Sequence, residues 1–272
     1  MSVGIAISIG IGLSTDAPAI VPLDPDADAF IIAAGITDPT EISAINTLVE
    51  DLKAAGLWTL LQAIYPIVGG TAATHKFNLK NPLDTDGAFR LTFALGWTHG
   101  TTGMTPNGTS SFANTHFDPN SDLVSYTSGT MGFYSRTANA TDGVDLGATT
   151  TVGNIYIRPA SATLTFLYGR PPTNAIGVVI PTDGFIANVR GTSTVWNGYR
   201  NGLNVGANPA AMVLAPVSDA LYLGARNNGG AADLFSDREL AFGVLGSRLN
   251  VTQNLNLYTA IQAYQTTLGR AV

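Results

Sequence analysis

The fold class is predicted most directly by one segment, residues 155–180, IYIRPASATLTFLYGRPPTNAIGVVI. The segment holds three short apolar runs, IYIRP, LTFLYG and IGVVI, and residues such as Thr, Gly, Pro and Asn separate them. Short runs with turn signals between them are typical of antiparallel strands in a sandwich. FRLTFALGW, LVSYT and GFYSR, upstream in the chain, have the same character. Because no strands alternate with long helices, a doubly wound parallel sheet is disfavoured. The sequence predicts a mainly β fold.

The amino-acid composition excludes some kinds of binding partner. Charged residues make up 12% of the 272 residues, and the formal net charge is −6. This charged share is about half of the usual one, so Ser, Thr, Asn and Gly must keep the surface wet, as in β-rich extracellular, adhesive or virion proteins. Without a basic cluster we expect no nucleic-acid partner. The chain has no cysteine, which excludes disulfides and thiolate metal sites.

The first residues alternate strictly between bulky and small side chains. SVGIAISIGIGLS, residues 2–14, predicts a strand, and residues 1–23 are assigned to a strand arm with a Pro-rich connector. We expect neither a secretory signal nor membrane insertion, because the stretch is short and lacks a basic start. The arm is predicted to be an assembly element covered by other chains; the alternative is a strand of the chain's own sandwich. Its interface residues would be the bulky set, Val3, Ile5, Ile7, Ile9, Ile11 and Leu13.

Residues 24–70 predict a small helical module. Asp24 followed by Pro25, and Asp38 followed by Pro39, each have the pattern of a helix N-cap and first turn. Glu41, three residues after Asp38, completes a capping-box arrangement. A third short helix is expected within residues 57–66. Gly69 and Gly70 mark the predicted boundary, and residues 71–272 should form a sandwich that folds without the helices. This sandwich includes a C-terminal helix that starts near residue 250 and ends at 269.

Three segments resemble known modules. TSTVWNGYRNGLNVG (192–206) is similar to the central strand pair of laminin-G and concanavalin-type jelly rolls, in which an aromatic residue precedes a short Asn-Gly turn. Residues 221–270 resemble the terminal part of lectin-like jelly rolls in tailed-phage virion proteins, and residues 26–82 look like a helical module that accompanies them. The resemblance implies an antiparallel jelly-roll β-sandwich of the concanavalin A/laminin-G type.

The same resemblance implies a function and a location. It implies a virion structural protein, such as a fibre, decoration or tail-associated subunit, with other virion proteins as partners. A homo-oligomer is expected, most simply a trimer. The alternative is a carbohydrate-binding adhesin whose sandwich rim contacts host glycans. A polysaccharide depolymerase is a further alternative.

The carboxylates and histidines of the chain are the candidates for a catalytic site. A retaining glycosidase needs two carboxylates about 5 Å apart. Glu239 is the lone glutamate of the β region, and SDREL places Asp237 and Glu239 on one face of a strand. The pattern around them fits a surface edge with local ion pairing. The three histidines, His75, His99 and His116, are scattered. The sequence therefore predicts that the chain is not an enzyme.

Binding residues are predicted at two places. Asp118, Asn120 and Asp122 alternate in a turn and either hold calcium or satisfy their own backbone; no other cofactor is expected. Aromatic side chains at the sandwich rim either stack on a sugar ring or fill the core. The residues concerned are Trp97, His99, Trp196 and Tyr199.

Overall fold

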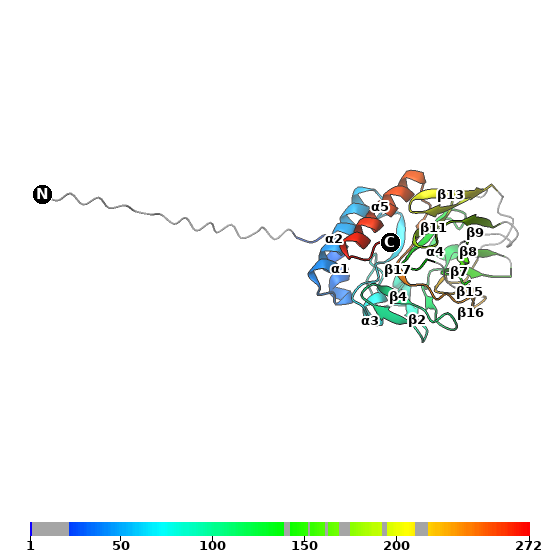
Figure 1. Ribbon diagram of the computed structural model, residues 1–272, viewed down its shortest axis with the longest axis horizontal. Helices are drawn as coiled ribbons and strands as arrows, with labels where there is room; N and C mark the ends of the chain where they lie inside the picture. Colours follow the sequence, from blue (N-terminus) through cyan, green and yellow to red (C-terminus); the bar gives the residue numbers. More distant parts are fainter. Residues whose placement is uncertain are drawn as a thin grey trace.

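A computed structural model of the chain (Figure 1) describes residues 1, 22–138, 142–151, 153–160, 163–168, 175–191, 195–209 and 217–272. Two β-sheets lie face to face, and three helices cover the outer face of one of them. We call the covered sheet the helix-side sheet and the other the outer sheet. The predicted mainly β sandwich with small helices is confirmed, whereas the residues predicted as the strand arm, from Val3 to Leu13, lie outside the described ones.

Every strand pair of the helix-side sheet is antiparallel. Its longest strands lie at the centre, and short strands lie at the edge next to β17. The strand order is β13 (Leu203–Asn208), β12 (Trp196–Arg200), β11 (Gly184–Arg190), β6 (Gly129–Ser135), β17 (Leu240–Ser247), β4 (Gly103–Thr105) and β3 (Thr98–Gly100), and β1 (Leu61–Tyr65) also pairs with β17.

The outer sheet is antiparallel except that β15 runs parallel to β7. Its strand order is β10 (Ile176–Val179), β9 (Thr163–Tyr168), β8 (Asn154–Ala160), β7 (Leu146–Thr149), β14 (Tyr222–Leu223), β5 (Ala113–Asn114) and β2 (Thr92–Phe93), with β15 (Arg226–Asn228) and β16 (Ala231–Asp233) branching from β7. The runs that suggested strands at residues 155–180 therefore form β8, β9 and β10, as predicted. LVSYT, residues 123–127, does not form a strand and consists of bend, turn and irregular backbone.

Alternation along the strands creates two cores. On β6, Phe133 joins the core between the sheets, whereas its neighbour Tyr134 joins the core under the helices. On β11, Ile186 and Phe185 divide in the same way. This is the expected consequence of a side-chain period of two. Since both faces of the helix-side sheet are apolar, the helices that cover one face belong to the core.

The helices start where the sequence predicts. Helix α1 (Pro25–Ala34) is capped by Asp24 and ends at Gly35, whose φ of 67° is left-handed. Helix α2 (Pro39–Ala54) is capped by Asp38. Helix α5 (Val251–Thr267) starts with Asn250 in a capping box. Short helical turns complete the set: α3 (Ala72–His75), η1 (Asp86–Ala88) and α4 (Pro119–Asp122).

The third predicted helix is wrong. Residues 61–65 form β1, which pairs antiparallel with β17. Both faces of this short strand are buried, since Ile64 packs under the helices and Tyr65 packs between the sheets. An apolar pattern that fits a helical stripe fits a strand buried on two sides equally well, and pairing with a distant strand decided the outcome.

The predicted boundary at residues 69 and 70 stays a prediction. The structure shows that residues before it contribute a strand to the helix-side sheet and the buried faces of α1 and α2 to a shared core. No helix within the described residues is long and apolar enough to cross a membrane.

Candidate functional site

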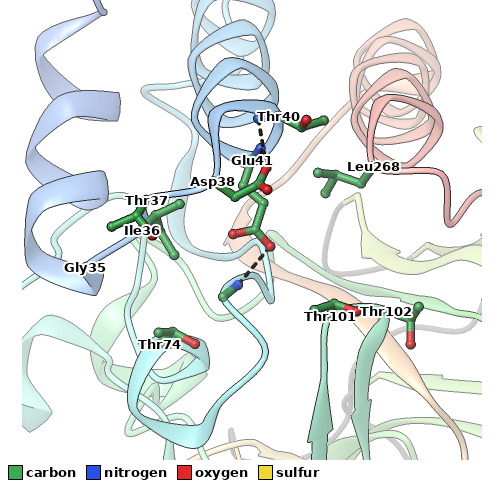
Figure 2. Close-up of a pocket in the computed structure, with 11 residues that line it drawn as sticks. Gly35, Ile36, Thr37, Asp38, Thr40, Glu41, Thr74, Thr101, Thr102 and Leu268 are labelled. Carbon is green, nitrogen blue, oxygen red and sulfur yellow. Dashed lines mark hydrogen bonds between the residues drawn. The ribbon is translucent and has the colours of Figure 1, made fainter.

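A pocket opens where the helices meet the β3–β4 hairpin (Figure 2). Its volume is about 440 Å³. Four parts of the chain form its walls: the turn between α1 and α2 with the start of α2, the turn before α3, the β3–β4 turn, and the end of α5. Its lining residues are Gly35, Ile36, Thr37, Asp38, Thr40, Glu41, Gly69, Thr74, Thr101, Thr102 and Leu268. We call it the threonine pocket.

The start of α2 supplies both carboxylates of this pocket. Asp38 Oδ1 accepts the backbone N–H groups of Thr40 and Glu41, at 2.8 and 3.0 Å. A capping box would turn the Glu41 side chain back to the N-cap residue. Instead, Glu41 Oε1 accepts the backbone N–H of Gly69 at 3.1 Å (Figure 2). Glu41 therefore points away from its own helix and bridges to the opposite wall.

Hydroxyl groups supply most of the remaining polar lining. Thr74 Oγ1 is occupied, because it donates to the carbonyl of Thr71 at 2.9 Å. Within the described part of the chain, no side-chain hydrogen bond engages the other four threonines, which are exposed. They are Thr37, Thr40, Thr101 and Thr102. Each hydroxyl can donate one hydrogen bond to a ligand and accept others.

A buried arginine fixes the base of this region. The Arg270 guanidinium donates to the carbonyls of Pro66 at 2.8 Å, Ile67 at 2.7 Å and Thr101 at 3.3 Å. Burial lowers the pKa of Arg270. Because these carbonyls belong to the turn after β1 and to the β3–β4 turn, Arg270 ties two walls of the pocket together.

Next to the threonine pocket lies a cluster of aromatic rings. His75 follows the pocket residue Thr74, and His99 lies on β3, two residues before Thr101; their Nδ1 atoms are 2.9 Å apart. Burial lowers the pKa of His75 to about 3, with His99 and Arg270 adding to the effect, and burial also lowers the pKa of His99. Both rings are therefore neutral at pH 7, and one donates a hydrogen bond to the other.

Trp97 extends this cluster to the rim of the sandwich. Residues 94–97 connect β2, at the edge of the outer sheet, to β3, at the same side of the helix-side sheet. The ring of Phe93 meets Trp97 edge-on at 5.6 Å and His99 at 4.7 Å, and Trp97 Nε1 donates to the carbonyl of Phe112. Trp97 and His99 are half-buried here, so their predicted contact with a sugar ring stays a prediction.

The other predicted aromatic pair lies in the interior. Trp196 is buried between the sheets, under the guanidinium of Arg190, whereas Tyr199 is buried under the helices. They face opposite sides of β12 and have exposed fractions of 0% and 2%. Both side chains fill cores, so neither exposes a ring face on which a sugar could stack.

The predicted calcium residues form a closed turn. Asp118 caps α4 and accepts the backbone N–H of Asn120 at 2.8 Å, and Asp122 Oδ2 accepts the backbone N–H of Asp118 at 2.7 Å. Burial raises the pKa of Asp118, with the charge of Asp122 contributing. Within the described ranges, no group of three or more His, Cys, Asp or Glu side chains could hold a metal ion. The contacts match a turn that satisfies its own backbone.

SDREL differs from its expected place at a surface edge. Glu239 is partly buried and pairs with Arg136 at 2.8 Å. Arg238 between the two acids is fully buried and pairs with buried Asp145 at 2.8 Å. The strand that follows, β17, lies inside the helix-side sheet and not at its edge. The buried pair was missed because Asp145 lies far upstream in the sequence.

No sequence pattern links the residues of the threonine pocket to one another. Asp38 and Glu41 were recognised only as capping residues, and the threonines resemble many others in the chain. The one usable signal was Glu41, whose carboxylate was assigned to a capping box that the structure does not close.

Comparisons with known proteins identify relatives by fold only. No protein-family model matches the chain, and no curated protein matches its sequence. A mutant of Trypanosoma rangeli sialidase displaying trans-sialidase activity is 12% identical, with 82% of this chain and 39% of that chain covered, at a TM-score of 0.52. The chain thus spans less than half the length of that sialidase.

Two weaker likenesses carry no argument, because their TM-scores are below 0.5. T. rangeli sialidase in complex with 2,3-difluorosialic acid is 14% identical over 80% of this chain and 39% of that one, at 0.46. The CBM40 of a Ruminococcus gnavus sialidase, bound to α2,3-sialyllactose, is 11% identical over 48% of this chain and 82% of that one, at 0.36.

The prediction from the carboxylates and histidines that the chain is not an enzyme is contradicted by the comparison of folds. The solved structure that shares the fold at a TM-score of 0.52 is a sialidase, which is an enzyme. At 12% identity this likeness shows the fold alone and assigns no catalytic residue here. The same comparison gives the virion context no support.

Proposed function

We propose that this chain is a carbohydrate-binding domain that holds a polyhydroxylated ligand in the threonine pocket. One observation carries the proposal: a single pocket is surrounded by two carboxylates and by four threonine hydroxyls that make no side-chain hydrogen bond within the described ranges. Sugars present many hydroxyl groups, each a donor and an acceptor. Threonine hydroxyls and carboxylate oxygens are matching partners for such groups.

The size of the pocket fits this ligand class. Small-molecule sites in proteins have volumes of about 300–1,000 Å³, and this pocket has about 440 Å³. Its walls are held by secondary-structure ends, by the Glu41–Gly69 hydrogen bond and by Arg270. A ligand would therefore meet a largely preformed site, which lowers the entropic cost of binding.

The aromatic cluster next to the pocket suggests a second contact. Trp97 and His99 lie at the rim of the sandwich. They precede Thr101 by four and two residues and lie on the same edge as it. A sugar chain longer than one residue would extend from the pocket toward Trp97 and stack there. This assigns the predicted stacking role to Trp97 and His99 as part of one extended site.

The test is a glycan array followed by titration calorimetry. Thr101→Val and Thr102→Val each remove one hydroxyl at nearly constant shape. A lost hydrogen bond of about 0.5–1.5 kcal/mol weakens binding about 2- to 10-fold. Thr47→Val, on the exposed side of α2 and outside the pocket lining, is the matched control and should bind like wild type.

Absence of any bound glycan on a broad array would refute the proposal. So would glycan binding that both pocket variants leave unchanged, because the ligand would then sit elsewhere. Incubating a bound glycan with the protein and measuring released sugar shows, in the same experiment, whether the chain also cleaves its ligand.

The virion role rests on sequence resemblance alone and stays a prediction. A glycan-binding subunit at the surface of a virion would combine the proposed carbohydrate binding with the predicted virion role, as an adhesin that contacts host glycans. Assembly with other virion proteins, or into a homo-oligomer through residues 2–14, would be tested by deleting those residues and measuring molar mass by light scattering. An unchanged mass would refute the assembly role.

A further inference from the structure

The charged side chains that line the threonine pocket are both carboxylates. Asp38 uses its Oδ1 atom to cap α2, and Glu41 uses its Oε1 atom to accept the Gly69 N–H (Figure 2). Within the described part of the chain, no hydrogen bond or ion pair engages Asp38 Oδ2 or Glu41 Oε2. Each carboxylate therefore keeps one oxygen that can accept hydrogen bonds from a ligand.

The buried arginine at the base of this region has no donor left for an anionic ligand. A guanidinium has five N–H donors, and Arg270, with an exposed fraction of 1%, uses all of them. The acceptors are Gln265 Oε1 and the carbonyls of Ile67, Thr101, Pro66 and Ala241. Among the described residues, the pocket lining includes no lysine, arginine or histidine. One buried positive charge against two carboxylates leaves the region negative, with no cation for a ligand to contact.

The helix ends at the pocket add to this negative potential. Gly35 and Leu268, which line the pocket, are the C-cap residues of α1 and α5, and neither helix has a basic residue in its last turn. The C-terminal end of a helix carries a partial negative charge of about 0.5. The positive end of α2 is already satisfied, because Asp38 accepts the N–H groups of Thr40 and Glu41. The pocket is therefore suited to a cationic group.

We propose that the preferred ligand of the threonine pocket is an amino sugar with a free ammonium group, and that the pocket disfavours sugars with a carboxylate. This inference rests on the proposed function and specifies the sugar class. The three N–H donors of an ammonium group match Asp38 Oδ2 and Glu41 Oε2, while the sugar hydroxyls contact the hydroxyls of Thr101 and Thr102. Hydrogen bonds between ionised groups are stronger than neutral ones. A sugar carboxylate would instead meet two like charges, which lowers its affinity.

The test compares sugars that differ in charge. Trisaccharides of glucosamine and of galactosamine are titrated into the full chain as free amines and in N-acetylated form, and α2,3-sialyllactose is compared with lactose. The buffer is at about pH 6, at which primary amines are protonated and carboxyl groups are ionised. One or both free-amine trisaccharides should bind about 5-fold tighter than the N-acetylated form, which corresponds to about 1 kcal/mol. Sialyllactose should bind no tighter than lactose.

Two variants remove the charges and keep the local structure. Asparagine is as good an N-cap as aspartate, so Asp38→Asn retains the start of α2, and Glu41→Gln retains an acceptor for the Gly69 N–H. Each variant should reduce the preference for the free amine about twofold, and the double variant should abolish it, while the N-acetylated form binds as before. Glu50→Gln is the matched control, an equal charge change at an exposed position of α2 outside the pocket lining.

The outcomes separate this inference from the proposed function. Tighter binding of a free amine on the wild-type chain, lost in the double variant and kept in Glu50→Gln, supports the inference. It is overturned if the N-acetylated forms bind as tightly as the free amines, if sialyllactose binds tighter than lactose, or if the double variant keeps the preference. In those cases Thr101→Val and Thr102→Val still show whether a sugar occupies the pocket. Absence of binding by every glycan on the array would refute the proposed function itself.

Discussion

Replacing Asp145 by alanine is expected to destabilise the fold more than any exposed charge change. Asp145 and Arg238 are both fully buried and their charged atoms are 2.8 Å apart. Ser236 Oγ donates to Asp145, and the guanidinium of Arg238 also donates to Thr182 and to Ser135 Oγ. The variant keeps the buried guanidinium and removes its only carboxylate partner among the described residues.

The expected loss follows from this burial. Breaking a buried pair by removing one partner costs about 3–5 kcal/mol, since the remaining charge cannot reach water. Burial raises the pKa of Asp145, even though Arg238 and Ser236 favour its ionised form, so desolvation is the dominant influence on this site. With an m-value of about 3 kcal/mol/M, the urea midpoint should fall by about 1–1.7 M.

The assay is urea unfolding at pH 7, followed by fluorescence and circular dichroism. Asp142→Ala is the matched control, because Asp142 forms a bidentate pair with Arg158 at 2.7 and 2.5 Å but is half exposed. That exposed pair should contribute less than about 1 kcal/mol. If Asp145→Ala costs no more than Asp142→Ala, the argument that the buried charge needs its partner is refuted.

Three further outcomes follow from packing and titration. Gly198→Ala would place a Cβ 2.5 Å from the Phe166 ring and should cost about 1–3 kcal/mol in a thermal melt, whereas Gly177→Ala, with no neighbour within 4 Å, should be near neutral. The pKa of His75 is about 3 in the fold and about 6.5 in the unfolded chain, so protonation of the unfolded chain at this residue should lower stability by about 2 kcal/mol between pH 8 and pH 5, while the pKa of Asp145, raised to about 6, opposes this loss. Stability of His75→Gln should therefore be about 2 kcal/mol less sensitive to this acidification than that of wild type. A chain that begins at residue 71 loses β1 and two of the three helices that cover the helix-side sheet, and calorimetry should show no cooperative melting, contrary to the sequence-based boundary.

Features set by neighbouring residues were predictable. The helix starts at Asp24, Asp38 and Asn250 were read from residues within one turn, and each side chain caps its helix. The hairpin around Asn201 and Gly202 also follows local rules, since both residues have positive φ. Each of these caps joins residues within one turn, so short sequence patterns were sufficient for them.

Features set by distant residues were not predictable. Residues 61–65 form a strand because they pair with β17, which follows almost two hundred residues later in the sequence. Arg238 was taken for a surface residue because nothing near it in the sequence shows Asp145, which neutralises it in the interior. In each case an interaction with a partner far along the chain determined the structure that the local sequence adopts.

The threonine pocket shows the same limit for function. Threonine is common in this charge-poor chain, so its presence alone marks no site. The fold separates Thr74, whose hydroxyl is used by its own turn, from Thr101 and Thr102, whose hydroxyls stay unengaged among the described residues. A ligand gains hydrogen bonds from the donor and acceptor capacity that the protein leaves unused. The candidate site is therefore defined by which polar groups the fold fails to satisfy, and only the folded chain shows that.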